Sequence, residues 1–164
     1  MALVLLPRLC RAIHAAQGAV LPASPGRRSR ENHKKARAPG VLIVDDTPDV
    51  RALYDEYFSA RGFKVTTARD AETGIATATQ SPPDVIVMDL SMPRIDGITA
   101  IRYLKADART RRIPVILLTG YPFRAIEEGA LEAGADAFMT KPCLPEDLEH
   151  QVRRLLARRR SHAA

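Results

Sequence analysis

Short apolar runs alternate with amphipathic segments from about residue 41 onward, and this alternation predicts the fold. The first run, VLIV at residues 41–44, is continuous rather than interrupted by polar residues, as expected for a strand covered on both faces of a parallel sheet. Five strands are predicted in all, at residues 41–44, 63–68, 85–88, 115–118 and 137–140.

Amphipathic segments that predict helices follow each run. In the first, Thr47 suits the N-cap and Pro48 the first helical position. Its apolar residues recur with the spacing of a helical stripe: Val50, Leu53, Tyr54, Tyr57 and Phe58. Asp70 is expected to cap the second helix, and Gly62 and Gly134 to end the first and the fourth. The last helix, from about residue 145, is expected to bury four residues: Leu148, Val152, Leu155 and Leu156.

A strand followed by a helix therefore occurs five times, which is typical of an α/β protein with helices on both faces of a parallel sheet. Of the two common doubly wound arrangements, five strands favour the flavodoxin-like order 2-1-3-4-5. We predict a five-stranded sheet in this order with five helices.

Charge is distributed unevenly along the 164 residues, which carry a formal net charge of +6. Residues 1–40 hold eight lysines and arginines against one glutamate, so that the remainder of the chain has a net charge of −1. We predict a disordered basic extension over 1–39, one folded domain over 40–160 and a short tail over 161–164. An organelle transit peptide and an over-extended start remain alternative interpretations of the extension.

Two cysteines, Cys10 and Cys143, are too few for a disulfide framework. No apolar run approaches the roughly 18–20 residues that a membrane span requires. We therefore expect a cytoplasmic protein without a membrane segment. Because the folded domain has no excess of positive charge, we do not expect it to bind nucleic acid specifically.

Polar residues follow four of the predicted strands: Asp45 with Asp46, then Asp89, Thr119 and Lys141. The carboxyl ends of parallel strands share one edge, and ligands bind there between strands 1 and 3. Clustered carboxylates repel one another unless a counter-charge is present, and a hard cation such as Mg²⁺ suits oxygen ligands. A carboxylate, a metal, a lysine and a hydroxyl together suit phosphoryl transfer to the carboxylate.

Four motifs at these strand ends resemble the receiver domains of two-component response regulators. They read VLIVDD, VIVMDLSMPRIDG, VILLTG and FMTKP, and the resemblance extends over residues 41–156. Since no output domain is expected, the chain resembles a stand-alone receiver of the chemotaxis type.

The resemblance implies that Asp89 is the phosphoacceptor and that Asp46 binds Mg²⁺ directly. It implies that Asp45 orients the metal or contacts it through water, and that the backbone carbonyl of Ser91 completes the protein ligands. Thr119 is then expected to hydrogen-bond one phosphoryl oxygen.

Lys141 is expected by the same resemblance to pair with another phosphoryl oxygen. Pro142 matches the cis-proline of the family, and Phe138 its switch aromatic, although Phe138 as a simple core residue is an equal alternative. Two positions depart from the usual pattern: Gly120, where the family often has alanine, and Cys143, where an aromatic is commoner.

The implied donor is a sensor histidine kinase or a phosphotransfer protein. The implied output is binding of a partner protein to the face formed by the fourth helix, fifth strand and fifth helix. The chain is expected to promote only its own phosphorylation and dephosphorylation, and so not to be an enzyme in the usual sense.

Four other functions are weighed against this one. An aspartate-nucleophile phosphatase needs a second acid two residues after its nucleophile, where this chain has Ser91. A pseudo-receiver that is never phosphorylated is disfavoured because the residue set is complete. Nucleic-acid binding by the extension, which lacks aromatic residues for stacking on bases, is expected to be weak and salt-dependent. A GTPase is excluded because the glycine-rich phosphate loop is missing.

Overall fold

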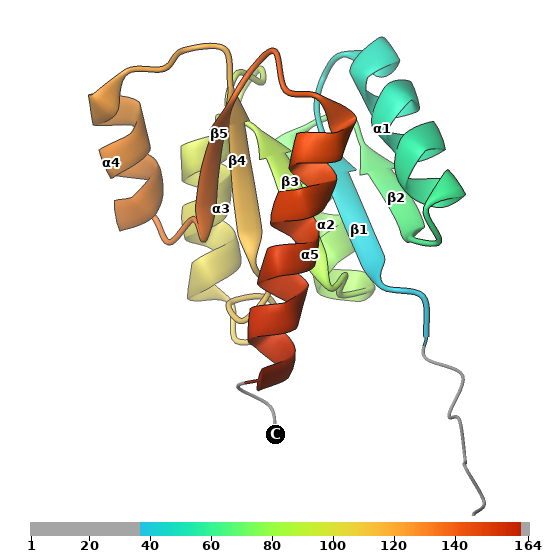
Figure 1. Cartoon of the computed structure of the whole chain (residues 1–164). Coiled ribbons are helices and arrows are strands. Elements are labelled where there is room, and N and C mark those ends of the chain that lie inside the picture. Colours follow the sequence, from blue (N-terminus) through green and yellow to red (C-terminus); the bar gives the residue numbers. More distant parts are fainter. Residues whose placement is uncertain (1–36, 162–164) are drawn as a thin grey trace, which may run out of the picture. The chain divides into compact units, whose positions relative to one another are not determined.

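Five parallel strands form the central sheet in the order β2-β1-β3-β4-β5, which confirms the predicted order (Figure 1). The computed structural model describes residues 37–161. The strands are β1 (Gly40–Val44), β2 (Lys64–Ala68), β3 (Val85–Asp89), β4 (Val115–Thr119) and β5 (Ala137–Thr140). Strands β1, β3 and β4 are almost wholly buried because helices cover both faces of the sheet.

Each strand is followed by a helix, and the five helices divide between the two faces. They are α1 (Pro48–Ala60), α2 (Ala71–Gln80), α3 (Gly97–Ala106), α4 (Arg124–Glu132) and α5 (Pro145–Ser161). One apolar core lies between the sheet and helices α1 and α5, and includes Phe58, Ile43 and Leu148. The other lies under α2, α3 and α4, and includes Leu42 and Ile101. Ile43 and Leu42 belong to different cores because successive strand residues point to opposite faces.

The helix ends follow the local chemistry. Asp70 and Asp96 each accept a hydrogen bond from the backbone three residues later, and so cap α2 and α3. Gly62 and Gly134 follow α1 and α4 with positive φ angles of 82° and 100°, a backbone conformation that glycine adopts most easily. Thr47 occupies the N-cap of α1, but its side chain does not cap the helix.

Two apolar residues are less buried than predicted. Leu53 belongs to the predicted stripe of α1 but is 51% exposed. It precedes the buried Tyr54 by one residue, about 100° around the helix, which turns it away from the sheet. Leu156 is only partly buried, whereas Leu155 beside it faces the core.

The predicted extension over 1–39 lies almost entirely outside the described residues, as does most of the predicted tail. Of the extension, residues 37–39 are described. The guanidinium of Arg37 pairs with Asp84 at 2.8 Å, and the carbonyl of Pro39 accepts a hydrogen bond from the Lys64 N–H. Within 37–161 no helix combines the length and the apolar character that crossing a membrane would need.

Candidate metal centre

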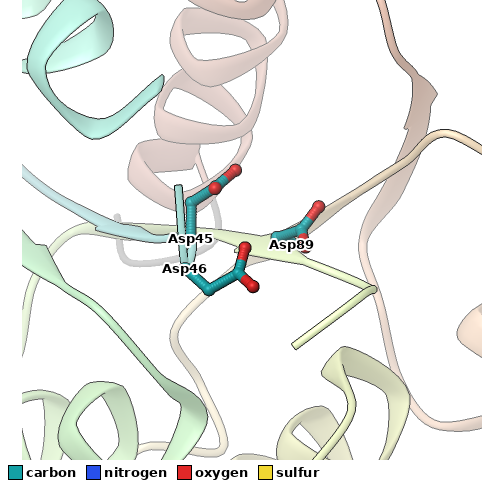
Figure 2. A group of neighbouring side chains, drawn as sticks. All are labelled: Asp45, Asp46 and Asp89. Carbon is teal, nitrogen blue, oxygen red and sulfur yellow. The ribbon is translucent and has the colours of Figure 1, made fainter. Parts of the chain in front are cut away.

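Three carboxylates meet at the carboxyl edge of the sheet (Figure 2). Asp45 and Asp46 directly follow β1, and Asp89 is the last residue of β3. Because β1 and β3 are paired, with Val44 opposite Met88, the residues at their ends lie side by side. Each aspartate offers one oxygen within 4.8 Å of the others. Asp45 and Asp89 are buried, whereas Asp46 is exposed to solvent.

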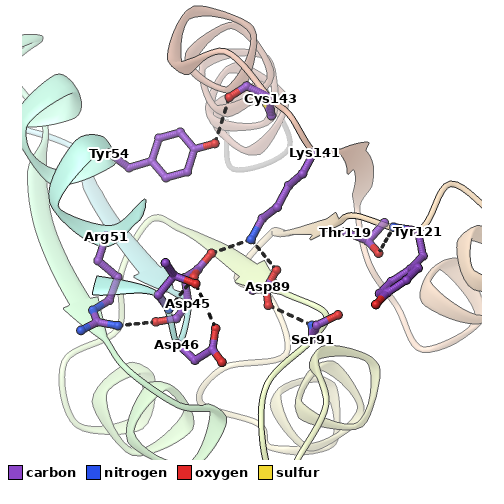
Figure 3. A network of polar contacts seen from close by, with 11 residues as sticks. Asp45, Asp46, Arg51, Tyr54, Asp89, Ser91, Thr119, Tyr121, Lys141 and Cys143 are labelled. Carbon is purple, nitrogen blue, oxygen red and sulfur yellow. Dashed lines mark hydrogen bonds and ion pairs between the residues drawn. The ribbon is translucent and has the colours of Figure 1, made fainter. Parts of the chain in front are cut away.

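Lys141 brings a positive charge into this cluster from the loop after β5. Its Nζ lies 2.7 Å from Oδ2 of Asp45 and 2.6 Å from Oδ1 of Asp89 (Figure 3). The backbone N–H of Lys141 donates to the Thr119 carbonyl at 2.7 Å, and the Lys141–Pro142 peptide bond is cis. Residues at the carboxyl ends of β1, β3 and β5 thus meet at one point.

The charges in the cluster do not balance. Burial raises the pKa of Asp89, and the nearby Asp45 charge adds to this, whereas the Lys141 ammonium opposes it; the net direction is upward. Burial tends to lower the pKa of Lys141, but its bonds to Asp45 and Asp89 outweigh this and raise it, so the ammonium stays charged. One ammonium against three carboxylates leaves a negative excess that a divalent cation would offset.

Backbone and guanidinium groups hold the buried carboxylates in place. The N–H of Thr47 donates to Oδ1 of Asp45, and the N–H of Ser91 donates to Oδ2 of Asp89, both at 2.9 Å. Arg51, in the first turns of α1, donates from its guanidinium to the Asp45 carbonyl at 2.7 Å. The sequence analysis assigned no role to Arg51. The only feature of the sequence that points to this contact is that a basic residue follows closely after the acidic pair.

Tyr54 makes a second contact that the sequence analysis missed. Its hydroxyl donates to the carbonyl of Cys143 at 3.1 Å, in the loop that carries Lys141 (Figure 3). Burial raises the pKa of Tyr54 above its ordinary value, and the contact with Cys143 adds to the effect, so the phenol remains protonated and able to donate. The sequence could have indicated this contact, because a tyrosine in the apolar stripe of α1 needs a hydrogen-bond partner for its hydroxyl when it is buried.

Thr119 and Phe138 lie on the strands beside the carboxylates. Asp89 is opposite Leu118 in the β3–β4 ladder, so Thr119 is the next residue along the same edge. Thr119 is buried, and its Oγ1 accepts a hydrogen bond from the Tyr121 N–H at 3.0 Å. Phe138 is partly buried and packs against the core under α2, α3 and α4.

The donor set fits Mg²⁺. The cluster of Asp45, Asp46 and Asp89 supplies only carboxylate oxygens and contains no histidine or cysteine. Mg²⁺ binds through one or two carboxylates and keeps several waters, which suits a cluster with one side open to solvent at Asp46. Zinc sites instead use histidine and cysteine as their commonest ligands.

A doubly wound sheet with acidic residues at the β1 and β3 ends and a lysine after β5 defines a receiver-like α/β protein. The model of the response regulator receiver domain matches residues 41–153. The chain belongs to this family, whose members are signalling phosphoacceptor domains of two-component systems. Receiver domains bind Mg²⁺ in an acidic pocket and interact with histidine kinases or phosphotransfer proteins.

Individual relatives agree with this assignment. The response regulator PleD of Caulobacter vibrioides is 41% identical over 102 residues, which are 62% of this chain and 22% of PleD. The chemotaxis protein CheY4 of Vibrio cholerae has a similar structure, with a TM-score of 0.69, 26% identity, and coverage of 72% of this chain and 98% of that one.

A third relative was crystallised with a metal. The receiver domain of sensor histidine kinase PA1611 from Pseudomonas aeruginosa PAO1 has a magnesium ion coordinated in its active-site cleft. It shares 28% identity and a TM-score of 0.68, with coverage of 73% of this chain and 98% of that one. This chain spans between 22% and 53% of the full length of PleD and seven other curated relatives.

Proposed function

We propose that Asp89 accepts a phosphoryl group and that the phosphorylated chain signals by binding a partner protein. The observation that carries this proposal is the position of Lys141, whose ammonium contacts both Asp89 and Asp45 at 2.6–2.7 Å. Such a group is placed to stabilise negative charge that develops next to the Asp89 carboxylate.

The transfer forms one bond and breaks one bond. A carboxylate oxygen of Asp89 attacks phosphorus of a phosphohistidine in a sensor kinase or phosphotransfer protein. An O–P bond forms while the P–N bond breaks, and the released imidazole nitrogen can take a proton from solvent. Lys141 pairs with one phosphoryl oxygen, and the hydroxyl of Thr119 donates to another.

The acidic cluster would hold Mg²⁺ during this transfer. Asp46 and Asp89 would bind the ion, Asp45 would bind it directly or through water, and the backbone carbonyl of Ser91 would complete the protein ligands. When bound, the ion supplies positive charge that offsets the charge of the phosphoryl oxygens. The negative excess of the cluster supports this assignment.

The output follows from groups near the new phosphoryl oxygens. Thr119 would exchange its bond from the Tyr121 N–H for one with the phosphoryl group, and Phe138 would move into the space that is freed. This would reshape the face formed by α4, β5 and α5, and a partner that prefers the new face would shift the equilibrium. In this proposal residues 40–160 act as a cytoplasmic receiver that needs no nucleic acid.

The decisive experiment is intact-mass analysis after incubation with acetyl phosphate and Mg²⁺. The wild-type chain should gain the mass of one phosphoryl group, and Asp89→Asn should gain none. Asp136→Asn is a control immediately before β5, at the opposite edge of the sheet from the cluster, and should be phosphorylated like the wild type. Equal labelling of wild type and Asp89→Asn would place the phosphoacceptor elsewhere.

Output through protein binding needs a separate test. Beryllofluoride with Mg²⁺ mimics a phosphoryl group on a carboxylate, so a tagged chain can be used as bait with and without it. The partners captured should differ between the two states. An identical set of partners would contradict signalling through the phosphorylated conformation.

A further inference from the structure

We propose that Tyr54 is a positioning residue for Lys141. Through its hydroxyl it fixes the loop after β5, and thereby holds the Lys141 ammonium at the phosphoacceptor. The inference rests on the function proposed above, because it concerns the same site. The motifs that identify the family do not include Tyr54, and its role becomes visible only in the contacts between α1 and this loop.

The loop that carries Lys141 is held at two points. It connects the end of β5 at Thr140 with the start of α5 at Pro145. On one side of Pro142, the Lys141 N–H donates to the Thr119 carbonyl of β4 at 2.7 Å. On the other side, the Cys143 carbonyl accepts the Tyr54 hydroxyl of α1 at 3.1 Å (Figure 3). The Tyr54 bond therefore supplies the second of these anchors.

Tyr54 is itself rigidly placed. Only 3% of its surface is exposed, and its ring packs against Phe58 at a centroid distance of 6.5 Å. A buried aromatic ring with its hydroxyl bonded has few alternative rotamers, so it transmits the position of α1 to the loop. By contrast, Leu144 in the same loop is 64% exposed and provides little packing of its own.

The same helix also holds the partner of Lys141. Arg51, one turn before Tyr54, donates to the Asp45 carbonyl at 2.7 Å. Helix α1 thus contacts both ends of the ion pair between Asp45 and Lys141: Arg51 holds the Asp45 backbone, and Tyr54 holds the Lys141 loop. Loss of the hydroxyl would release the lysine side while leaving the carboxylates of β1 and β3 in place.

This separation gives the proposal a distinctive signature. Mg²⁺ binding depends on Asp45, Asp46 and Asp89, so it should be almost unchanged when Tyr54 loses its hydroxyl. Phosphoryl transfer depends on where the Lys141 ammonium lies, and small displacements of a charge-stabilising group slow such reactions. A residue with a merely structural role would lower stability without separating these two properties.

The test uses Tyr54→Phe in the full chain, with Tyr57→Phe as its matched control. Both replacements remove one hydroxyl from α1, but that of Tyr57 donates to Glu149 of α5 and not to the Lys141 loop. Acetyl phosphate with Mg²⁺ serves as donor: an Asp89 oxygen bonds to phosphorus while the bond from phosphorus to the acetyl oxygen breaks, releasing acetate. The rate is followed by intact mass, and calorimetry gives the affinities for Mg²⁺ and for beryllofluoride.

We expect Tyr54→Phe to be phosphorylated about three- to tenfold more slowly and to bind beryllofluoride more weakly by a similar factor. Its Mg²⁺ affinity should stay within about twofold of wild type, and Tyr57→Phe should keep wild-type values of all three. A wild-type rate in Tyr54→Phe, or an equal slowing in both variants at matched folded fraction, would overturn the proposal. If the wild type itself is not phosphorylated, it is the proposed function that fails.

Discussion

Lys141 and Asp89 form an ion pair of 2.6 Å at the carboxyl edge of the sheet, between residues that the sequence places on different strands. The pair gives the site its own counter-charge. This one positive charge does not neutralise the site, however, because Asp45 shares the same ammonium and Asp46 lies beside them. Lys141 and a divalent cation should therefore have overlapping electrostatic roles, and each should matter more when the other is missing.

Replacement of Lys141 by methionine tests this overlap. The variant keeps most of the side-chain volume but leaves the buried Asp45 and Asp89 facing each other without a positive charge. We expect it to unfold about 1–3 kcal/mol more easily than wild type in the presence of a chelator. Mg²⁺ should restore more stability to the variant than it adds to wild type. Urea unfolding with chelator and with Mg²⁺ measures both effects.

Lys105→Met is the control for this experiment. Lys105 also pairs with an aspartate, Asp136, at 2.8 Å, but on the other edge of the sheet. Its loss should cost stability to the same extent with and without Mg²⁺. If Lys141→Met shows the same indifference to Mg²⁺ as Lys105→Met, the ammonium and the metal do not share a role.

Asp46 offers a test of the metal site with little effect on the apo fold, because its side chain is exposed. A ligand present at 100 times its dissociation constant stabilises a protein by about 2.7 kcal/mol. If Asp46→Asn weakens Mg²⁺ binding tenfold or more, this stabilisation should fall by at least about 1.3 kcal/mol. Thermal unfolding across a Mg²⁺ titration measures the loss. Asp49→Asn removes an exposed charge three residues later, outside the cluster, and should leave the titration unchanged.

The sequence predicted the sheet and the cluster because both follow from one rule. Apolar runs separated by helices give a parallel sheet, and its strands then end at one edge, which brings Asp45 and Asp89 together. No long-range contact has to be known for this step. The strand order, the aspartate cap at Asp70 and the glycines after α1 and α4 are local or topological features of the same kind.

The pattern of apolar and polar residues does not predict contacts between side chains of distant elements. The stripe of α1 places Tyr54 and Leu53 equally, yet Tyr54 is buried and Leu53 is half-exposed, since only packing decides which edge of the stripe faces the sheet. Likewise, Arg51 could have pointed to solvent. Its bond to the Asp45 carbonyl depends on how α1 crosses the end of β1.

Gly97 ties the start of α3 to the backbone of Asp89. A Cβ at this position would lie 2.3 Å from the Asp89 carbonyl oxygen and 2.8 Å from Cδ1 of Leu117. Gly97→Ala should therefore displace Asp89, destabilise the fold by about 1–3 kcal/mol and weaken Mg²⁺ binding. Chemical unfolding and a Mg²⁺ titration measure the two effects.

Gly129→Ala in α4 is the matched glycine control. A Cβ there meets only Cδ1 of Ile98, at 3.8 Å, an ordinary contact distance. Alanine inside a helix should be neutral or stabilising by up to about 1 kcal/mol, without any change in Mg²⁺ binding. Comparable Mg²⁺ affinities in Gly97→Ala and Gly129→Ala would show that the close approach to Asp89 does not set the geometry of the site.

Glu149 joins α5 to α1 and should make stability depend on pH away from the metal site. Burial tends to raise the pKa of this carboxyl, but hydrogen bonds from Arg153 and Tyr57 and the charges of Arg153 and Arg61 outweigh burial and lower it. The three partners lie 2.6–2.9 Å from its oxygens. A carboxylate with a lowered pKa stabilises the fold fully above its unfolded pKa of about 4.3, and this contribution disappears as pH falls through the folded value.

Glu149→Gln removes that contribution, so its cost should itself depend on pH. We expect the variant to be about 1–2 kcal/mol less stable than wild type at pH 7. The difference should shrink steadily as pH falls below about 4.3, where the wild-type carboxyl also becomes neutral. Urea unfolding of both proteins from pH 7 to pH 3 measures it. Glu146→Gln, on the exposed first turn of the same helix, should stay near wild type throughout; a constant cost for Glu149→Gln at every pH would mean that shape rather than charge holds α5 to α1.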